Sequence, residues 1–332
     1  MKIQSFYSQV VDKFFLVFNC SVVVVFFAAN AQAAEKLKEI RLDYAYYSPP
    51  SLVLKHFGWA EEEFKSEATS VKWVLSAGSN RALEYLNSGS VDFSSTAGLA
   101  SVLSRANGNP VKGVYIYSRP EWVALLVPKD SSIKSISDLK GKKVAATKGT
   151  DAYLFLLRSL HQHGLSKRDI EHASLQHADG RAALEQGRVD AWSGLDPLMA
   201  GSEIEKGSKI IYRNIDFNTY GFLNTTDTFA KQNPEYIKRV IKVYEKARSW
   251  ILANPEEAAK ILSKEAKIPL PVARLQLSRN DFSNPVPGVE HSKALKVAAP
   301  ILLEEKLVKK GANIEKVIDD LIDSGFAKAV IR

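Results

Sequence analysis

The chain has 332 residues, of which 45% are hydrophobic and 25% charged, and its formal net charge at pH 7 is +8. Single hydrophobic cores stop growing at roughly 250 to 300 residues, so this length gives room for two domains with separate cores. The basic excess is compatible with an anionic ligand. The sequence contains no basic run interleaved with aromatic residues, which argues against nucleic-acid binding.

The first 33 residues differ from the rest and predict a secretory signal peptide. Lys2 and Lys13 flank a polar start, residues 14–29 are almost wholly apolar, and Ala31-Gln32-Ala33 forms a small-x-small cleavage site. We therefore expect cleavage after Ala33 and a periplasmic mature chain. A membrane anchor is the alternative, but Asn19 interrupts an apolar run already shorter than the roughly 20 residues that a spanning helix needs.

The single cysteine, Cys20, lies inside this segment. It allows a second alternative, a lipoprotein whose cysteine is acylated after cleavage, although Phe18-Asn19 before it fits that pattern poorly. Cleavage after Ala33 leaves the mature chain without cysteine. Disulfides, thiolate chemistry and cysteine-ligated metals are then excluded.

The mature chain begins with alternating strand and helix patterns. We expect a strand at 40–46, a helix from Leu52 to about Trp59 and a strand at 71–75, a βαβ start that implies a parallel sheet. Further elements are expected in this order: a helix and a strand within 81–96, a helix from Gly98 toward Arg105, and strands at 111–118 and 122–128.

Beyond Pro128 the chain becomes polar and rich in turn residues, as a crossing between two lobes would be. The second lobe is expected to contain strands at 143–147, 169–175 and 209–214 and a helix at 151–164. Residues 216–226 resemble a return crossing, and the pattern from Asn233 onward is helical. The sequence therefore predicts one lobe from 34–128 plus 218–332 and a second from 129–217.

One passage occurs twice, at Arg81–Thr96 and at Arg181–Gly194. Val91-Asp92 and Val189-Asp190 occupy matching places, and in each copy a helix-forming run ends at a glycine, where a left-handed cap has little steric cost. Small polar turns precede both helices, at 77–80 and 178–180. Two such α/β units in succession predict two lobes that face a common cleft.

The turn Lys148-Gly149-Thr150-Asp151 lies between a predicted strand and a predicted helix. Its N–H groups and the positive end of the helix dipole can hold an oxyanion. It is not a Walker A loop, because Lys142 stands where the first glycine should be. Similar turns are predicted at Ser79-Asn80, Ser95-Thr96 and Asp179-Gly180, at strand ends where ligands bind in α/β sheets. Helix capping is the alternative role for each of them.

Aromatic residues near the predicted strand ends could wall an apolar part of a ligand. They are Tyr46, Tyr47, Trp122, Tyr153, Trp192, Phe217 and Tyr220. A place in the core is the alternative for each. Trp192 is the strongest candidate, because Asp190, Ser193 and Asp196 make its neighbourhood polar.

Signals for catalysis are poor. The six histidines lack a metal spacing, and His161 and His163 lie about 200° apart on a helix. No histidine falls at a predicted strand end in a convincing motif. Two serine-x-x-lysine matches, at Ser131 and Ser137, lie in a charged loop and not at a helix start. We therefore expect a binding protein without metal or cofactor, and not an enzyme.

Three segments, DLKGKKVAATKGTDAYLFLLRSL, GRVDAWSGLDP and DFSSTAGLAS, resemble the substrate-binding proteins of ABC importers in the alkanesulfonate, taurine and nitrate group. The resemblance runs from about Lys38 to near the C-terminus. It implies an α/β fold of the type II periplasmic-binding-protein class, with two Rossmann-like lobes joined by two hinge strands. It also implies a permease and its ATPase subunits as partners.

In that family the Lys148–Asp151 turn, the Ser95-Thr96 loop and the segment that ends at Asp196-Pro197 border the ligand. Two departures concern the pocket, since family members often carry an acidic residue where this chain has Gly98 and an aromatic residue where it has Leu195.

The combined prediction is a monomeric periplasmic protein that binds an aliphatic sulfonate. A sulfate ester, taurine or nitrate are alternative ligands, and an exported enzyme acting on a small heterocycle is an alternative of another class. An amine-bearing ligand would need an acid in the cleft, such as Asp151 or Asp196. The candidate ligand-binding residues are Ser48, Ser79, Asn80, Ser95, Thr96, Trp122, Lys148, Gly149, Thr150, Asp151, Tyr153, Trp192, Asp196 and Asn218.

Overall fold

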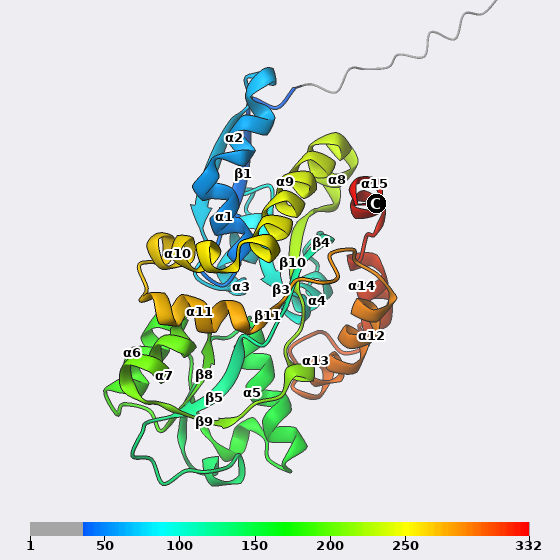
Figure 1. Cartoon of the computed structure of the whole chain (residues 1–332). Helices are drawn as coiled ribbons and strands as arrows, with labels where there is room; N and C mark the ends of the chain where they lie inside the picture. Colours follow the sequence, from blue (N-terminus) through cyan, green and yellow to red (C-terminus); the bar gives the residue numbers. More distant parts are fainter. Residues whose placement is uncertain (1–35, 332) are drawn as a thin grey trace, which may run out of the picture. The chain divides into compact units, whose positions relative to one another are not determined.

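The computed structural model describes residues 36–331, whose strands form sheets of two, four and five strands with their covering helices (Figure 1). The two- and four-stranded sheets are joined by a single bridge and are described together as the first sheet. The predicted signal peptide, its cleavage site and Cys20 lie outside the described residues. In the described part, no helix has both the length and the apolar character needed to cross a bilayer.

The first sheet is built by strands from both ends of the described chain. β1 (Glu39–Tyr44) and β2 (Ser70–Leu75) are parallel, with Glu39 opposite Ser70, and a bridge between Leu42 and Phe93 joins β1 to the rest. The rest is antiparallel in the order β11-β4-β10-β3. Its strands are β3 (Ser94–Ala97), β4 (Val111–Pro120), β10 (Gly221–Thr226) and β11 (Asn280–Asp281).

The second sheet has the order β7-β6-β8-β5-β9. Its strands are β5 (Val123–Val127), β6 (Lys143–Ala145), β7 (Glu171–Ala173), β8 (Ala191–Leu195) and β9 (Lys209–Tyr212). β6 runs parallel to β7 and β8, whereas β5 is antiparallel to β8 and β9. β5 pairs with β8 and β9, so the chain passes from the first sheet to the second before Val123.

Short helices connect the strands of each sheet (Figure 1). Those of the first sheet are α1 (Pro49–Phe57), α2 (Trp59–Phe64), α3 (Ser79–Asn87) and α4 (Gly98–Ala106). Those of the second are α5 (Asp151–Gln162), α6 (His177–Glu185) and α7 (Leu198–Lys206). Each passes from one strand to the next, as expected for α/β units.

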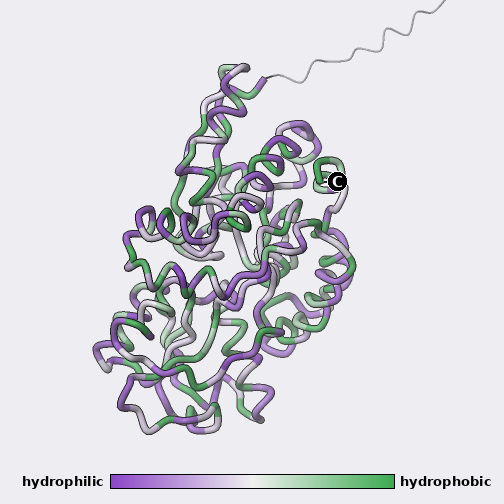
Figure 2. Tube along the Cα trace, in the orientation of Figure 1, coloured by the Kyte–Doolittle hydropathy of each residue, from purple (hydrophilic) through white to green (hydrophobic). Residues whose placement is uncertain are grey.

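After β10 the chain is almost entirely helical, as the sequence predicted. These helices are α8 (Asp227–Gln232), α9 (Pro234–Ala253), α10 (Pro255–Ala266), α11 (Leu270–Ser278), α12 (Val289–Ala298), α13 (Pro300–Glu304), α14 (Ile314–Leu321) and α15 (Gly325–Val330). Hydrophobic and hydrophilic residues alternate along them (Figure 2), consistent with helices that bury one face.

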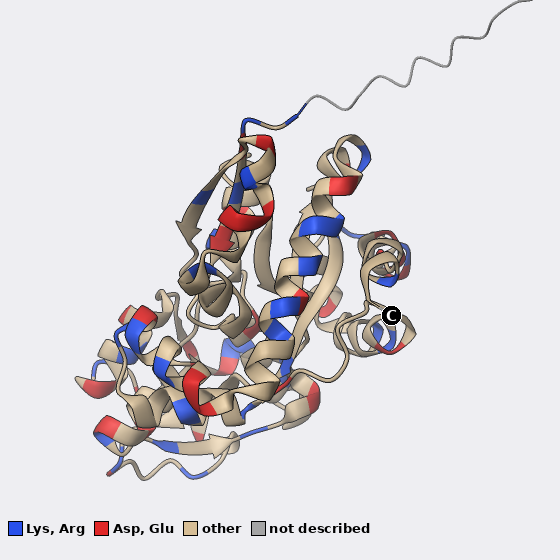
Figure 3. Cartoon of the chain, turned by 45° about the horizontal axis from the view of Figure 1, so that its top comes forward, with Lys and Arg blue, Asp and Glu red and all other residues tan. Residues whose placement is uncertain are grey.

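Acidic and basic residues are interspersed along the outer helices (Figure 3). Arg239 of α9, for example, donates from Nε to Glu63 Oε1 of α2 at 3.0 Å. Several of the basic residues are thus paired with acidic residues of the same surface.

The two copies of the repeated passage form equivalent structures. The backbone N–H of Arg41 donates to Asp92 Oδ2 at 2.8 Å, and that of Lys143 donates to Asp190 Oδ2 at 2.7 Å. In each copy the aspartate of the Val-Asp pair therefore accepts a hydrogen bond from the backbone at the start of a neighbouring parallel strand. The repeat predicts two related α/β units, and the structure contains them.

Two predicted turns differ in the structure. Ser95 and Thr96 lie within β3 and not in a loop after it, because β10 pairs with them. Asp179 and Gly180 lie inside the first turn of α6, since this helix begins at His177. The predicted helix from Leu52 also begins earlier, at Pro49, where proline suits the first turn of a helix.

Candidate functional site

A cavity of about 170 Å³ lies between residues of the two sheets. On the first-sheet side it is bordered by the loop after β1 and by the turn after β2. On the second-sheet side it is bordered by the start of α6 and by the connection from β8 to α7. The lining residues are Tyr46, Tyr47, Leu75, Ser76, Ala77, Gln176, His177, Ala178, Leu195, Asp196, Pro197 and Leu198.

The N-termini of α3 and α6 meet beside this cavity. Neither Gly78, before α3, nor Gln176, before α6, provides a side-chain cap. Asn80 Nδ2 donates to Gln176 Oε1 at 3.4 Å across the gap. Because the first N–H groups of a helix lack partners within it, two sets of donors converge here. Helix dipoles add positive potential at the same place.

The turn just before α5 also reaches this region. A β-carbon on Gly149 would stand 3.3 Å from Asn80 Cβ. Gly149 itself has φ +77, a left-handed conformation that favours glycine. The predicted residues Asn80 and Gly149 are therefore brought together, although neither lines the cavity of about 170 Å³.

His177 is a residue of this site that the sequence analysis missed. Its side chain is 2% exposed and lines the cavity, and neither ring nitrogen has a hydrogen-bond partner. Burial lowers the pKa of His177 to about 4, so the ring is neutral at pH 7. The repeat could have indicated this position. When Arg81 is aligned with Arg181, His177 falls opposite Ala77, which also lines the cavity.

Asp151 ties the start of α5 to both crossings between the sheets. Its Oδ2 accepts from Trp122 Nε1 at 3.1 Å and from the Thr219 N–H at 2.9 Å, while Oδ1 accepts from Thr219 Oγ1 at 2.8 Å. Burial raises the pKa of Asp151 to about 6, and these hydrogen bonds act in the opposite direction. The carboxylate of Asp151 and the indole N–H of Trp122 therefore already have hydrogen-bond partners within the chain.

Asn218 joins the same two crossings. Its Oδ1 accepts from the Val123 N–H at 2.8 Å, and its Nδ2 donates to the Asn214 carbonyl at 2.9 Å. Both side-chain groups are therefore used in fixing the crossings. The structure places Asn218 in the connection and outside the cavity lining.

Asp196 lines the cavity and is paired with an arginine from the first-sheet side of the chain. Arg279 Nη1 lies 3.2 Å from Asp196 Oδ1 and 3.3 Å from Oδ2, and Arg279 Nη2 contacts Glu203 Oε2 at 2.6 Å. The Ala200 N–H donates to Asp196 Oδ1 at 2.9 Å. Burial raises the pKa of Asp196 to about 6, opposed by the charge of Arg279.

The predicted serine and threonine residues have diverse surroundings. Ser79 Oγ accepts from the Ala97 N–H at 3.0 Å. Thr96 Oγ1 accepts from Asn224 Nδ2 at 2.7 Å, which places it in an internal network. Ser48 and Ser95 are buried, and their hydroxyl oxygens have no partner within the chain. Neither of these two residues lines the cavity.

Four other predicted residues lie away from the cavity. Thr150 Oγ1 donates to the Thr147 carbonyl at 2.7 Å. Lys148 and Tyr153, with Gly149, line a separate groove of about 360 Å³. Trp192 lies in the core of the second sheet, with its Nε1 only 2.6 Å from where a β-carbon on Gly180 would stand. Ser193, the next residue of β8, faces the opposite side of the strand. The polar sequence neighbours therefore did not reveal the surroundings of Trp192, which are apolar.

The lining of the cavity combines neutral donors with apolar walls. Among the lining residues that the structure describes, none is lysine or arginine, and the nearby Arg279 is neutralised by Asp196 and Glu203. Within residues 36–331, no cluster of side chains suits a metal ion. The arrangement can hold a small ligand that has hydrogen-bond acceptors at one end and an apolar group at the other.

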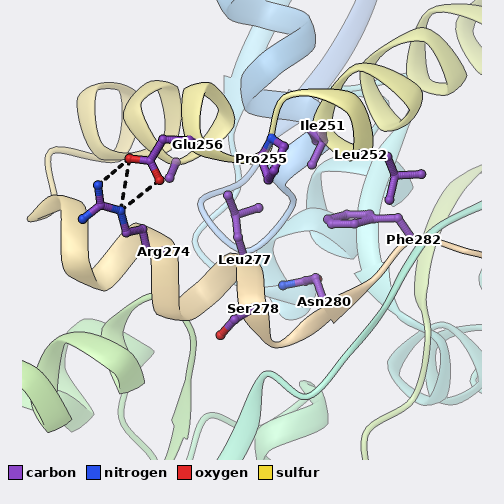
Figure 4. Close-up of a pocket in the computed structure, with 10 residues that line it drawn as sticks. Ile251, Leu252, Pro255, Glu256, Arg274, Leu277, Ser278, Asn280 and Phe282 are labelled. Atoms are coloured by element: carbon purple, nitrogen blue, oxygen red, sulfur yellow. Dashed lines mark hydrogen bonds and ion pairs between the residues drawn. The ribbon is translucent and has the colours of Figure 1, made fainter.

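A different pocket, of about 380 Å³, lies beside α10 and α11 (Figure 4). Its walls are largely apolar, with Leu252, Leu277 and Phe282 among them, and the ion pair of Arg274 with Glu256 stands at one edge. It shares no lining residue with the cavity beside α3 and α6. We assign it no role in the site.

Gly98 and Leu195 were expected to alter the pocket. A β-carbon on Gly98 would stand 2.7 Å from Phe222 Cε2 and 2.9 Å from Leu295 Cδ2, so no acidic side chain fits at this position. Leu195 lines the cavity, where it adds an aliphatic surface.

Comparisons with known proteins agree on one family. The family model described as NMT1/THI5 like matches residues 52–258. A protein of Escherichia coli named for binding aliphatic sulfonates is 30% identical over 292 residues, which cover 87% of this chain and 91% of that relative.

Solved structures give the same result. The alkanesulfonate-binding protein SsuA from Xanthomonas axonopodis pv. citri, bound to MOPS, is 25% identical with a TM-score of 0.78 over 86% of this chain and 99% of that one. The periplasmic aliphatic sulphonate binding protein SsuA from Escherichia coli is 28% identical with a TM-score of 0.73, over 85% and 92% of the two chains. The predicted periplasmic-binding-protein fold is therefore confirmed.

Proposed function

The chain belongs to the NMT1/THI5-like family, and from that premise we propose that it is the sulfonate-binding component of an ABC importer. It captures a small aliphatic sulfonate in the cavity beside α3 and α6 and presents it to a membrane permease. The sequence relatives and the solved SsuA structures named above are binding proteins for this ligand class. The chain is accordingly a binding protein and not an enzyme.

The observation that carries this proposal is the meeting of two helix N-termini without side-chain caps beside one cavity. A sulfonate has three oxygens that share one negative charge. First-turn N–H groups of α3 and α6 would donate to these oxygens, and the helix dipoles would stabilise the charge. Lysine and arginine are absent from the described lining, so recognition relies on neutral donors.

The volume and the walls limit the organic group. An apolar cavity of about 150 Å³ in another protein holds benzene, so about 170 Å³ suits a short alkyl group. Leu75, Ala77, Leu195 and Leu198 supply aliphatic surface, and Tyr46 and Tyr47 supply aromatic surface. Burial of the alkyl group then adds to the affinity through the hydrophobic effect.

The acids near the cleft favour an alkyl sulfonate over an amine-bearing one. A ligand such as taurine would need a free carboxylate, but Asp151 is bound by Trp122 and Thr219, and Asp196 is paired with Arg279. A sulfate ester differs from a sulfonate by one bridging oxygen and remains an alternative ligand. Nitrate lacks an organic group that would use the apolar walls.

The proposal also covers where the protein acts, which partners it has and how its lobes are divided. The signal peptide at 1–33 would direct the chain to the periplasm, where it would act as a monomer with a permease and its ATPase subunits. The lobes would be 34–122 plus 218–332 and 123–217, with the first boundary moved to the start of β5. Closure of the lobes about the two crossings would exclude water from the bound ligand.

Isothermal titration calorimetry of the mature protein tests this function. The panel consists of methanesulfonate, butane-1-sulfonate, MOPS, taurine, ethyl sulfate and nitrate. We expect butane-1-sulfonate to bind with Kd below about 1 mM, or about 4 kcal/mol. Asn80→Ala, at the start of α3, should weaken binding, whereas Asn87→Ala, at the exposed end of the same helix, should not. Failure of every sulfonate to bind would overturn the proposal.

A further inference from the structure

The histidine that begins α6 has both of its ring nitrogens without a partner, and this is unusual in the molecule. The chain contains six histidines. In the other five at least one ring nitrogen has a hydrogen-bond partner: His56 with Glu265, His161 with Glu305, His163 with the Ser159 carbonyl, His172 with the Ala146 carbonyl and His291 with the Gly288 N–H. Only His177, among the described residues, has neither nitrogen paired.

An unpaired polar group in a buried position is costly, and nearly all buried polar groups are paired. His177 is as buried as the core residues around it, with 2% of its surface exposed. An ordinary structural histidine would use at least one nitrogen in a hydrogen bond to the chain. The exception therefore points to a partner that is not part of the chain.

The position of His177 indicates what that partner is. Its ring borders the cavity that the proposed function assigns to the ligand. It also lies against the opposite side of the cleft, because a β-carbon on Gly78 would stand 3.0 Å from its Nε2. Ser76 Oγ and Asn80 Oδ1, from that opposite side, are likewise buried without partners.

We propose that His177 contacts the bound ligand directly and determines specificity by donating a hydrogen bond from its neutral imidazole to an oxygen of the sulfonate. This inference rests on the proposed function and names a residue of the same site. A neutral imidazole has one N–H donor, so it requires an acceptor on the ligand. A purely apolar compound of the same size would leave that donor unsatisfied and would bind more weakly.

Substitutions at this position test the contact. His177→Leu fills similar space without a donor, and we expect it to weaken butane-1-sulfonate binding by about 10- to 100-fold. Asn places an amide where Nδ1 lies, and Gln places one where Nε2 lies. One of these two variants should restore most of the affinity, which identifies the donating nitrogen. His172→Leu, a half-buried histidine outside the cavity, is the matched control and should bind normally.

An NMR measurement distinguishes direct contact of His177 with the ligand from a purely structural role of this residue. In protein labelled with ¹⁵N at histidine, the His177 ring signals are identified by their absence in His177→Gln. We expect them to shift on titration with butane-1-sulfonate, while those of His172 stay in place. Ring signals of His177 that do not move at saturation, or unchanged affinity in His177→Leu, would overturn the inference alone. A wild-type protein that binds no sulfonate would instead overturn the proposed function.

Discussion

The ring of His177 and the backbone of Gly78 meet across the cleft so closely that a β-carbon on residue 78 would stand 3.0 Å from His177 Nε2 and 2.9 Å from Asn80 Oδ1. The two residues lie in the segments just before the two copies of the repeat. Their contact shows that the repeat contributes the start of one helix from each copy to the same cavity.

Gly78→Ala should therefore oppose closure. The added methyl group would displace the His177 ring, and we expect weaker binding of butane-1-sulfonate, by about tenfold, in calorimetry. Gly89→Ala, at the other end of α3, is the matched control, because residue 89 also has positive φ but nothing lies within 4 Å of its β-carbon. Equal affinities in Gly78→Ala and Gly89→Ala would contradict the expected clash.

The pairing of Arg279 with Asp196 and Glu203 should contribute strongly to stability. Arg279→Leu leaves the buried Asp196 carboxylate without its cation, so we expect the free energy of unfolding to fall by about 3 kcal/mol in urea denaturation. Arg274→Leu, in α11 just before Arg279, removes an exposed pair with Glu256 and should cost under about 1 kcal/mol. Similar losses in the two variants would show that burial of the pair is unimportant.

Asp151 should make stability depend on pH. Its pKa in the folded protein is about 6, above the unfolded value of about 3.9, so the folded state binds more protons between these values. Its contribution to the free energy of unfolding is fully present below about pH 4 and is lost as the pH rises through about 6. The variant Asp151→Asn keeps one side-chain oxygen that can accept hydrogen bonds, but its amide does not titrate.

The stability of the wild type relative to Asp151→Asn should therefore increase from about pH 7 to about pH 4, by ~3 kcal/mol. Urea denaturation of both proteins across this range measures the difference. A difference that stays flat, or that decreases as the pH falls, would rule out a raised pKa at Asp151.

Gly180→Ala should reduce stability, although alanine normally favours a helix by about 1 kcal/mol over glycine. The new methyl group would stand 2.6 Å from Trp192 Nε1, and crowding of a packed core costs about 1 to 3 kcal/mol. Gly201→Ala in α7 meets the flexible ends of two side chains, Arg181 and Glu205, and should be neutral or stabilising. Thermal unfolding followed by tryptophan fluorescence compares them, and equal stabilities would contradict the packing argument.

Much of the fold could be predicted because strands and helices leave a local periodic pattern. The apolar run at 122–128 predicts β5, for example, and the repeat predicts two related α/β units. The pattern could not show which sheet β5 joins, because that depends on pairing with β8 and β9, which lie far along the chain.

The candidate site was harder to predict for the same reason. Asp151 and Asp196 were recognised as polar groups near strand ends, but their partners Thr219 and Arg279 lie far away in sequence. Trp192 was judged from its polar neighbours, whereas in β8 its side chain faces the core. The repeat aligns His177 with Ala77, but the missing hydrogen-bond partners of its ring could not be predicted, because they become evident only once α3 and α6 have met.

The most direct test of the central claim is a crystal structure of the mature protein with butane-1-sulfonate. We predict that the sulfonate oxygens contact the first turns of α3 and α6 and the ring of His177, with the alkyl group against Tyr46, Tyr47 and Leu195. Binding of the sulfonate in the groove beside Lys148 and Tyr153, with no ligand between α3 and α6, would contradict the account.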